Sequence, residues 1–514
     1  MTVVSIDPRT GAAVEDVADE TTTDEVAALC AEATEATAQL AALLPRQRAD
    51  LLRAMADELD AHRERLVALA DRESALGPAR LNGELARTTG QLRLFAEVLE
   101  DGHAFEAVID HGDQGRGIPD LRRMMIGIGP VAVFGASNFP FAFSAAGGDT
   151  ASALAAGNAV VVKAHGSHPR LDAEVVGILR AVCADTGLSA ATVSVVYGRQ
   201  AGTDLVQDPR IQAVGFTGSE SVGRMLMDLA AARPQPIPVF AEMGSLNPLV
   251  VSPRAAEARA AELAEGIAGS VTLGHGQFCT KPGIVLVPTG DAGDRVVSGL
   301  AAAMGGREQQ YMLSPAIRRT FEDNVAAVAD GLGVRMLLPV RPVGEDGSAA
   351  HVALAEVGAA NLAADPSVLR ECFGPACLVV RFDGTTQLLD TLRLVEPSLT
   401  VSVHAEPAET VLVTAVGDLA ARRAGRLIFN GYPTGVAVSW AQTHGGPYPA
   451  ASSGQYTSVG AAAITRFLRP VSFQSWPDEL LPPHLQEANP LGLPRRVDGR
   501  LAPAPAPERA GSRP

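Results

Sequence analysis

The stretch Gly129-Pro-Val-Ala-Val-Phe-Gly-Ala-Ser-Asn-Phe-Pro140 decides the fold that this sequence predicts. Its apolar run, 131–134, is followed at once by a glycine and a polar turn, which is typical of a buried strand leaving a sheet. The pattern recurs in strands at 158–163, 193–197, 211–214 and 238–242, between helical segments at 142–156, 171–184 and 219–232. Strands that alternate with helices predict parallel βαβ units in an α/β fold with a doubly wound sheet, which binds ligands at the carboxyl ends of its strands.

On either side of this region the pattern changes. The first hundred residues are predicted to be helical, in segments at 26–43, 46–69 and 78–99, and a loop or hairpin is expected at 101–120. A second alternation begins near Pro248, with a helix at 255–273 and strands at 284–287 and 378–382. We therefore expect a boundary between two α/β domains near residue 245. The Pro/Ala-rich tail at 501–514 is predicted to be disordered.

The composition excludes several classes of function. The 514 residues carry a formal net charge of −16, which argues against a nucleic-acid binder, and no apolar run is long enough for a membrane span or a signal peptide. The five cysteines indicate reduced thiols in the cytoplasm, and their spacing fits no zinc site, so no metal is expected. Only two of the 42 basic residues are lysines, Lys163 and Lys281, and a lysine kept in so arginine-rich a chain is a candidate for a specific role.

Three residues at expected strand ends or turns could carry acyl chemistry. Cys279 lies in Gly274-His-Gly-Gln-Phe-Cys-Thr-Lys-Pro-Gly283. Most free cysteines are small buried hydrophobes, but a core strand would not be interrupted by so many glycines, and a turn here would present the thiol. Glu242 ends an apolar strand, a position that suits a general base as well as an exposed strand end. Asn138 follows a strand, and its amide could donate to an oxyanion or simply form a turn.

Other segments indicate cofactor binding more weakly. Gly215-Phe-Thr-Gly-Ser219, which continues to Gly223, follows a predicted strand and opens a helix, the arrangement that binds phosphate at a helix N-terminus. Its glycine spacing differs from the dinucleotide fingerprint, so an ordinary tight turn is about as good an interpretation. The segments that begin at Glu371 and His444 are also unusual, although a single histidine is more often structural.

Together these segments resemble the aldehyde dehydrogenase superfamily, from about residue 5 to residue 500. The resemblance rests on four motifs whose joint occurrence is specific: Asn-Phe-Pro at 138–140, Glu-Met-Gly at 242–244, the cysteine motif and Glu-x-Phe-Gly-Pro at 371–375. Further segments resemble the subgroup of 2-oxoglutarate semialdehyde (2,5-dioxopentanoate) dehydrogenases and NADP-linked fatty aldehyde dehydrogenases. These segments lie at 135–140, 146–152, 239–248, 425–430 and 444–449.

The resemblance assigns catalytic roles to three residues. Cys279 would attack the aldehyde as a thiolate and become a thioester when hydride leaves for the nicotinamide. Asn138 and the Cys279 N–H would hold the oxyanion, and Glu242 would activate the water that hydrolyses the thioester. His444 would line the active site.

It also assigns residues to an NAD(P) cofactor. Lys163 would bind the adenosine ribose or a phosphate, and Ser219 would bind the pyrophosphate. Glu371 would hold the nicotinamide ribose, and Phe373 would pack near the nicotinamide. The full set of expected cofactor-binding residues is Lys163, Ser167, Gly218, Ser219, Gly223, Glu371 and Phe373.

Two positions depart from the family pattern. Many NAD-specific members have a glutamate three residues after the lysine, where this chain has Gly166 between His165 and Ser167. Loss of that carboxylate removes its repulsion of a 2′-phosphate, so NADP is expected as the cofactor, with NAD also accepted. Lys281 stands where a neutral residue is expected. Its charge could lower the pKa of Cys279 or attract a substrate carboxylate, but an exposed, solvated lysine is the simpler interpretation.

The resemblance further implies how the chain is organised. It predicts a cofactor-binding domain at 1–107 and 129–245, a catalytic domain at 246–445, and an oligomerisation hairpin at 108–128 that pairs with part of 446–490. By analogy, the protein would be a homodimer or homotetramer.

The expected reaction is the NAD(P)+-dependent oxidation of an aldehyde to a carboxylic acid. The expected substrate is 2-oxoglutarate semialdehyde, and fatty or other aldehydes are the alternative. A catalytically silent nucleotide-binding relative is disfavoured because nucleophile, base and oxyanion donor are all present. Transfer of the acyl group to coenzyme A is disfavoured because Glu242 would hydrolyse the thioester first. The sequence places no cation for the far carboxylate of a semialdehyde.

Overall fold

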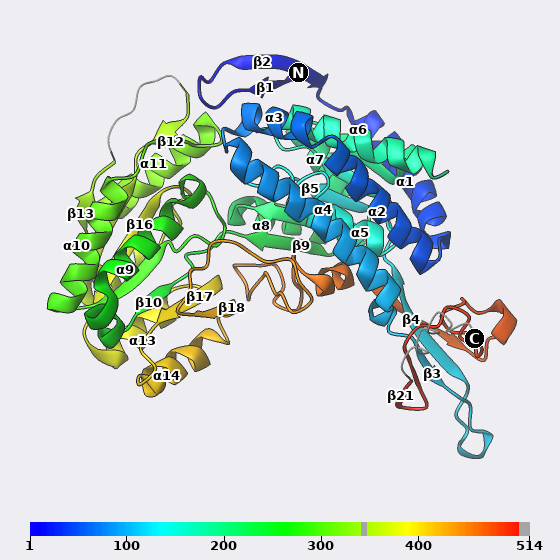
Figure 1. Cartoon of the computed structure of the whole chain (residues 1–514). Helices are drawn as coiled ribbons and strands as arrows, with labels where there is room; N and C mark the ends of the chain where they lie inside the picture. Colours follow the sequence, from blue (N-terminus) through cyan, green and yellow to red (C-terminus); the bar gives the residue numbers. More distant parts are fainter. Residues whose placement is uncertain (341–346, 503–514) are drawn as a thin grey trace, which may run out of the picture.

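Two large sheets form the body of the molecule in this computed structural model, which describes residues 1–340 and 347–502 (Figure 1). The first sheet has five parallel strands in the order β7-β6-β5-β8-β9. They are β5 (Val131–Phe134), β6 (Val160–Lys163), β7 (Val193–Val196), β8 (Ala213–Gly218) and β9 (Val239–Met243). The chain adds strands to one side of the central β5 and then to the other, so the predicted doubly wound parallel sheet is confirmed.

Helices α1 to α8 surround this sheet, and their bounds correct two predictions. They are α1 (Thr23–Ala42), α2 (Pro45–Ala61), α3 (Arg63–Ser74), α4 (Pro78–Asp101), α5 (Gly148–Ala155), α6 (Pro169–Asp185), α7 (Arg199–Gln207) and α8 (Glu220–Ala231). The predicted helix at 46–69 is in fact two helices, because the backbone leaves the helical region at His62. The predicted helix at 142–156 is wrong in its first half, where 142–147 form turns that only a glycine at 147 allows.

Alternate residues of β5 pack into opposite hydrophobic clusters. Val131 and Val133 face a core that α2, α3, α4 and α6 cover. Ala132 and Phe134 face the cluster under α1, α7 and α8. This alternation follows from the two-residue period of a strand. Because both faces of β5 are buried, all four of its residues are apolar.

The second sheet has seven strands in the order β13-β15-β16-β11-β10-β17-β18, of which β13 is an antiparallel edge. In chain order they are β10 (Leu249–Val251), β11 (Ile284–Pro288), β13 (Arg335–Leu338), β15 (Ala353–Gly358), β16 (Ala376–Phe382), β17 (Ser398–His404) and β18 (Ala424–Phe429). Its helices are α9 (Pro253–Thr272), α10 (Asp291–Gly305), α11 (Pro315–Ala329), α12 (Ala359–Ala364), α13 (Gly384–Leu394) and α14 (Thr410–Ala420). The chain passes between the two sheets in the short segment 244–248.

A third sheet projects away from the body (Figure 1). Its strand order is β19-β4-β3-β20-β21, and the members are β3 (Val108–Asp110), β4 (Leu121–Gly127), β19 (Leu468–Gln474), β20 (Arg495–Val497) and β21 (Arg500–Ala502). β4 pairs antiparallel with both β3 and β19. Leu501 and Ala502, predicted as the start of a disordered tail, instead end β21, and the rest of that tail lies outside the described residues.

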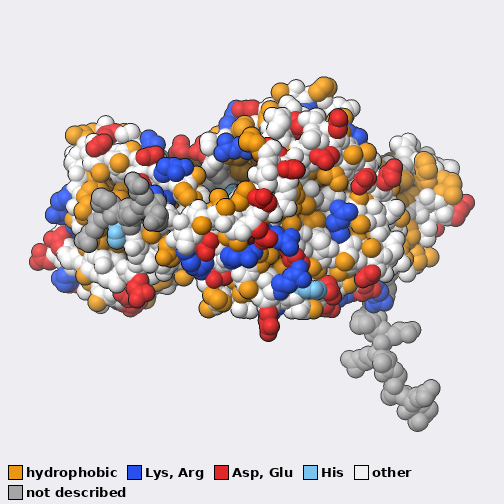
Figure 2. Space-filling model, turned by 90° about the horizontal axis from the view of Figure 1, so that it is seen from above, with side chains coloured by type: hydrophobic (Ala, Val, Ile, Leu, Met, Phe, Trp, Pro, Cys, Tyr) orange, Lys and Arg blue, Asp and Glu red, His pale blue; other side chains and the backbone are white. Residues whose placement is uncertain are grey.

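Two further antiparallel strand pairs lie outside the three sheets. The antiparallel hairpin of β1 (Thr2–Ile6) and β2 (Ala13–Asp19) was not predicted, and β12 (Gln310–Tyr311) pairs with β14 (Ala349–Ala350). Among the described residues, no helix combines the length and apolarity that crossing a membrane requires. On the face drawn in Figure 2, basic side chains are interspersed with acidic ones.

Candidate active site

The turn that carries Cys279 lies between the short helix η4 (Leu273–Gly276) and β11, and Asn247 holds it. The Nδ2 group of Asn247 donates to the carbonyl oxygens of Cys279 at 2.7 Å and of Lys281 at 3.0 Å. Its Oδ1 accepts a hydrogen bond from Thr400 Oγ1 at 3.2 Å, so the side chain is fixed at both ends. These bonds fix the backbone of the turn and leave the thiol free to face the site.

Cys279, His444 and Glu242 form one cluster. Sγ of Cys279 lies 3.6 Å from Nε2 of His444, and the same nitrogen lies 2.9 Å from Oε2 of Glu242. The second contact has the distance of an ion pair but not the alignment of a hydrogen bond, so within the described chain neither carboxylate oxygen of Glu242 has a hydrogen-bond partner. Because this carboxylate is buried with its lone pairs free, it can accept a proton.

The environment keeps the Cys279 thiol protonated. Burial raises the pKa of Cys279 well above its ordinary value, and the negative charges of Glu242 and Glu371 raise it further, while Arg87 has the opposite effect. A protonated thiol is a poor nucleophile, so a base must remove its proton before attack. His444, in contact with the sulfur, is placed for that step, with the carboxylate of Glu242 2.9 Å from the same ring nitrogen.

Two hydrogen-bond donors lie on or against the turn that carries Cys279, the Asn138 side-chain amide and the Cys279 backbone N–H. The Nδ2 group of Asn138 donates to the carbonyl oxygen of Gln277 at 3.0 Å, which draws the loop after β5 against the nucleophile turn. An amide nitrogen has two hydrogens, so one remains for an oxyanion. The backbone N–H of Cys279 donates to no acceptor among the described residues. Asn138 and this N–H can therefore form an oxyanion hole.

The N-terminus of α8 fits a pyrophosphate. Ser219 stands at the N-cap position, but its hydroxyl lies 3.3 Å from the Ser221 hydroxyl and does not cap the helix, so the first N–H groups of α8 stay available. Gly218 and Gly223 lie against Phe216 and Met243, where a side chain at either position would collide. Free N–H groups at a helix start together with a close backbone are suited to a dinucleotide phosphate.

Two cations lie at the carboxyl edge of the first sheet, where the adenosine end of a cofactor is expected. Lys163 ends β6; burial lowers its pKa, and the guanidinium of Arg199 at the start of α7 lowers it further. Arg199 is exposed and forms no ion pair with any part of the chain that the structure describes. Gly166 has open space where a side chain would be, and the N–H of Ser167 donates to His165 Nδ1 at 3.1 Å.

Glu371 and Phe373 lie on a loop that reaches the opposite end of the site. Burial raises the pKa of the Glu371 carboxyl to about 7, against the opposing charge of Lys281. Asn324 Nδ2 donates to the Glu371 carbonyl oxygen at 3.0 Å, and Gly244 leaves just enough room for the carboxylate. Phe373 is half-buried on the same loop.

Lys281 is not the exposed lysine that was predicted. Its side chain is fully buried, and Nζ donates to the carbonyl oxygens of Cys372 and Ala376, both at 2.7 Å. The prediction was wrong because the two acceptors come from a distant loop. Lys281 thus joins the nucleophile turn to the loop that carries Glu371.

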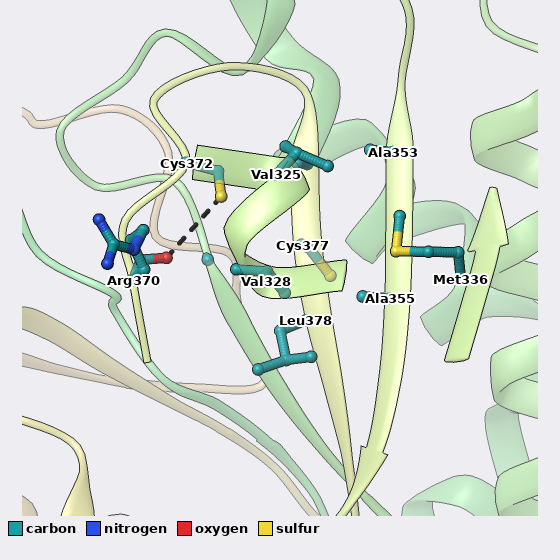
Figure 3. A pocket seen from close by; sticks show the side chains of 11 residues that line it. Val325, Val328, Met336, Ala353, Ala355, Arg370, Cys372, Cys377 and Leu378 are labelled. Carbon is teal, nitrogen blue, oxygen red and sulfur yellow. Dashed lines mark hydrogen bonds between the residues drawn. The ribbon is translucent and has the colours of Figure 1, made fainter. Parts of the chain in front are cut away.

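A small cavity of about 20 Å³ lies behind this loop (Figure 3). Cys372 and Cys377 point toward it, together with the apolar side chains of Val325 and Met336, and Cys372 Sγ lies 3.9 Å from the Arg370 carbonyl oxygen. It has room for a water molecule at most and contains no part of the Cys279 cluster. We regard it as a packing void of the second sheet.

Asp172 ties two loops of the first sheet together. Its carboxylate accepts hydrogen bonds from the Ser144 hydroxyl at 2.7 Å and from the His165 N–H at 2.9 Å. His168, one turn before Asp172, places Nδ1 3.3 Å from the carboxylate and Nε2 2.9 Å from the Ala136 carbonyl oxygen. The loop with the oxyanion donor and the loop with the adenosine-end residues therefore share one buried ion pair.

Sequence reasoning missed several of these residues. Asn247 could have been noticed, because it lies five residues after Glu242 in a motif already singled out. Arg199 directly follows the glycine after β7, which is a position at the carboxyl edge of the sheet. His168 and Asp172 gave no such signal, because their partners are distant in sequence.

Comparisons with known proteins agree with this geometry. The model of the aldehyde dehydrogenase family matches residues 1–471. The chain is 47% identical over 458 residues to alpha-ketoglutaric semialdehyde dehydrogenase 2 of Azospirillum brasilense, an alignment that covers 88% of this chain and 87% of that protein. It is 41% identical over 460 residues to the alpha-ketoglutaric semialdehyde dehydrogenase of Acinetobacter baylyi, covering 89% and 87%.

A solved structure supports the fold. The gamma-glutamyl-gamma-aminobutyraldehyde dehydrogenase of Burkholderia cenocepacia superposes with a TM-score of 0.79 over 92% of this chain and 93% of its own, at 22% identity. At that identity the likeness establishes the architecture, not the substrate.

Proposed function

The chain belongs to the aldehyde dehydrogenase family and is an NAD(P)-dependent enzyme; from that premise we propose that it oxidises 2-oxoglutarate semialdehyde to 2-oxoglutarate. The contact of the Cys279 thiol with His444 and Glu242 supports this proposal most directly, because it supplies a nucleophile and a base in one buried cluster. The substrate follows from the two semialdehyde dehydrogenases that are 47% and 41% identical.

The first half of the reaction is acylation of Cys279. The thiol proton moves to Nε2 of His444, the nitrogen in contact with the sulfur, and is then released to solvent, so that Glu242, 2.9 Å from that nitrogen, stays ionised for the second half. The thiolate then forms a bond to the aldehyde carbon, and the oxyanion that develops accepts hydrogen bonds from Asn138 and the Cys279 N–H. Loss of hydride from this adduct leaves a thioester.

The residues around the site can hold a nicotinamide cofactor, whose chemistry is to accept that hydride when bound. The N–H groups at the start of α8 would hold its pyrophosphate, with Ser219, Gly218 and Gly223 shaping the approach. Glu371 would hold the nicotinamide ribose, with Phe373 beside it. Lys163 would hold the adenosine end.

The second half is hydrolysis of the thioester. Neither oxygen of Glu242 is occupied by a hydrogen bond within the described chain, so the carboxylate can accept a proton from a water molecule as that water attacks the thioester carbon. Release of the acid returns the thiol. Overall, the aldehyde, one water and the oxidised cofactor give the acid, the reduced cofactor and one proton.

We propose NADP as the preferred cofactor. Gly166 removes the carboxylate that would repel a 2′-phosphate, and its surroundings are open. Lys163, three residues before Gly166, and Arg199, whose charge acts on Lys163, would supply positive charge, and Ser167 directly follows Gly166. Exchanging Arg199 for Ala is expected to raise KM for NADP about tenfold and to leave KM for NAD within a factor of two.

The organisation of the chain also remains a proposal. We assign 1–107 and 129–245 to cofactor binding, 246–445 to catalysis, and the hairpin 108–128 with part of 446–490 to homo-oligomer formation. The projecting sheet of β3, β4 and β19 supports the last assignment, because its position leaves it free to meet a second subunit (Figure 1). Five unpaired cysteines fit a reducing compartment such as the cytoplasm.

The test is a direct assay. Purified protein is mixed with 2-oxoglutarate semialdehyde and NADP, with and without coenzyme A, and reduction is followed at 340 nm. We expect reduction at the same rate in both, with 2-oxoglutarate as the product. Dependence on coenzyme A would indicate acyl transfer, and no reduction with any aldehyde would indicate a silent relative. Cys279→Ala should abolish turnover and keep cofactor binding.

A further inference from the structure

Helix α4 turns a charged face toward the active site. Arg80, Glu84 and Arg87 are spaced by four and three residues, so they lie on one side of the helix. Glu84 is buried, and its Oε1 accepts hydrogen bonds from the N–H groups of Phe141 and Ala142 in the loop after β5. The face of α4 therefore packs against the loop that also carries the oxyanion donor.

Arg87 has two hydrogen-bond donors without an acceptor in the described part of the chain. Its Nε donates to the Val436 carbonyl oxygen at 3.3 Å, and its guanidinium carbon lies 5.0 Å from the centre of the Phe143 ring. Both terminal nitrogens, Nη1 and Nη2, are buried without a hydrogen-bond partner in the described part of the chain. A buried guanidinium with two free ends is costly unless a ligand completes it.

Arg87 lies near the Cys279 cluster. The Phe143 ring that its guanidinium covers lies 6.2 Å from the His444 ring, centre to centre, and His444 contacts the nucleophile. The positive charge of Arg87 is close enough to the Cys279 thiol to lower its pKa. The guanidinium therefore lies beside the Cys279 cluster without touching it.

The other two arginines near the site already donate through terminal nitrogens, Arg80 through one of them and Arg426 through both. Arg80 donates to the Asn138 carbonyl oxygen at 2.6 Å and lies over the Phe139 and Phe278 rings. Arg426 donates through both terminal nitrogens to backbone carbonyl oxygens at 433 and 435. Of these three arginines, Arg87 alone keeps both ends of its planar fork free, and a planar fork is matched by a carboxylate.

We propose that Arg87 binds the carboxylate at the far end of the substrate and so makes the enzyme specific for aldehydes that carry one. This inference rests on the proposed function and adds the residue that recognises the acid end of the semialdehyde. A fatty aldehyde would bury the two free ends of Arg87 against an alkyl chain, which is unfavourable, so the same residue discriminates against that class.

The test compares two five-carbon aldehydes, 2-oxoglutarate semialdehyde and pentanal, which lacks the carboxylate. In Arg87→Met, we expect kcat/KM for the semialdehyde to fall at least about 30-fold, mostly through KM, because one partner of a buried charge pair is removed. The value for pentanal should stay within about threefold. Arg87→Lys, which keeps the charge but loses the fork, should fall in between. Arg93→Met is the control and should change neither value, because Arg93 is a half-buried arginine on the same helix that pairs with Asp57 and Asp60.

The outcomes are distinct. An equal loss for both aldehydes in Arg87→Met would overturn the inference, since it would mean that Arg87 acts on the thiol and not on the substrate. Unchanged values for both would also overturn it. If the wild type itself prefers pentanal, the proposed substrate fails, independently of Arg87. Should Arg87→Met not fold, the same comparison is made with Arg87→Lys, where a loss confined to the semialdehyde supports the inference and an equal loss or none opposes it.

Discussion

The ion pair of His168 and Asp172 should make the stability of the fold depend on pH in the alkaline range. Both side chains are completely buried. Burial alone lowers the pKa of His168, but the charge and hydrogen bonding of Asp172, the Ala136 carbonyl oxygen and the more distant Glu73 outweigh it and raise the pKa to about 9. His165 stacks nearby, and burial lowers its pKa well below the ordinary value, so it stays neutral. His168 is therefore protonated in the folded protein at neutral pH.

The size of the effect follows from the two pKa values. An unfolded histidine has a pKa near 6.5, and the folded value is about 9. At about 1.4 kcal/mol for each tenfold change in proton affinity, the difference contributes about 3 kcal/mol. Because the folded pKa is the higher one, this stabilisation is complete below pH 6.5 and is lost as the pH rises toward 9. His168→Gln removes the charge and can keep a donor for the Ala136 carbonyl oxygen.

The measurement is urea unfolding of wild type and His168→Gln from pH 6 to pH 9.5. We expect the wild type to be more stable at pH 6 and the two curves to converge by about 3 kcal/mol as the pH approaches 9.5. Parallel curves over the whole range would refute a protonated His168.

Three further changes test the site. Gly244→Ala places a methyl group on the Glu371 carboxylate and should weaken NADP binding at least about tenfold, whereas Gly177→Ala in α6, which has open space, should not. Lys281→Met leaves two buried carbonyl oxygens without a donor and should cost about 2–4 kcal/mol in urea unfolding, while the pH profile of Cys279 alkylation stays unchanged. Glu242→Gln removes a negative charge that raises the pKa of Cys279, so alkylation of Cys279 by iodoacetamide at pH 8 should become faster while thioester hydrolysis stops. Slower alkylation would contradict the effect assigned to the Glu242 charge.

The elements of the first sheet were predictable because each is a short apolar run that ends in a glycine or polar turn. Val131–Phe134 was predicted with its observed bounds, since a strand buried on both faces needs no alternation to be recognised. The hairpin of β1 and β2 was missed for the opposite reason. All of its residues except Ser5 are half-buried or exposed, and its apolar residues fall in adjacent pairs such as Val3-Val4 and Val17-Ala18, so no alternation marks a strand.

Only the site residues that belong to a recognisable motif at a strand end or turn could be predicted from the sequence. Asn138, Glu242 and Cys279 each lie near a strand end or turn, so the α/β fold itself gathers them. The surroundings that decide how those groups ionise come from elsewhere. The acceptors of Lys281 lie 91 and 95 residues farther along the chain, and the ring under Arg87 lies on a different loop. No local pattern reports such partners.

The choice between lysine and arginine at the buried positions has a physical basis. At residue 281 two carbonyl oxygens converge on one point at 2.7 Å, which suits the compact ammonium of a lysine, whereas a guanidinium is wider and directs its donors apart. At residue 87 the same width would suit the proposed carboxylate, because both terminal nitrogens lack a partner in the described chain and a planar guanidinium matches the two oxygens of a carboxylate. A lysine in this arginine-rich chain therefore marks a position that suits a compact donor, whereas the composition does not distinguish Arg87, the proposed carboxylate ligand, from the other arginines.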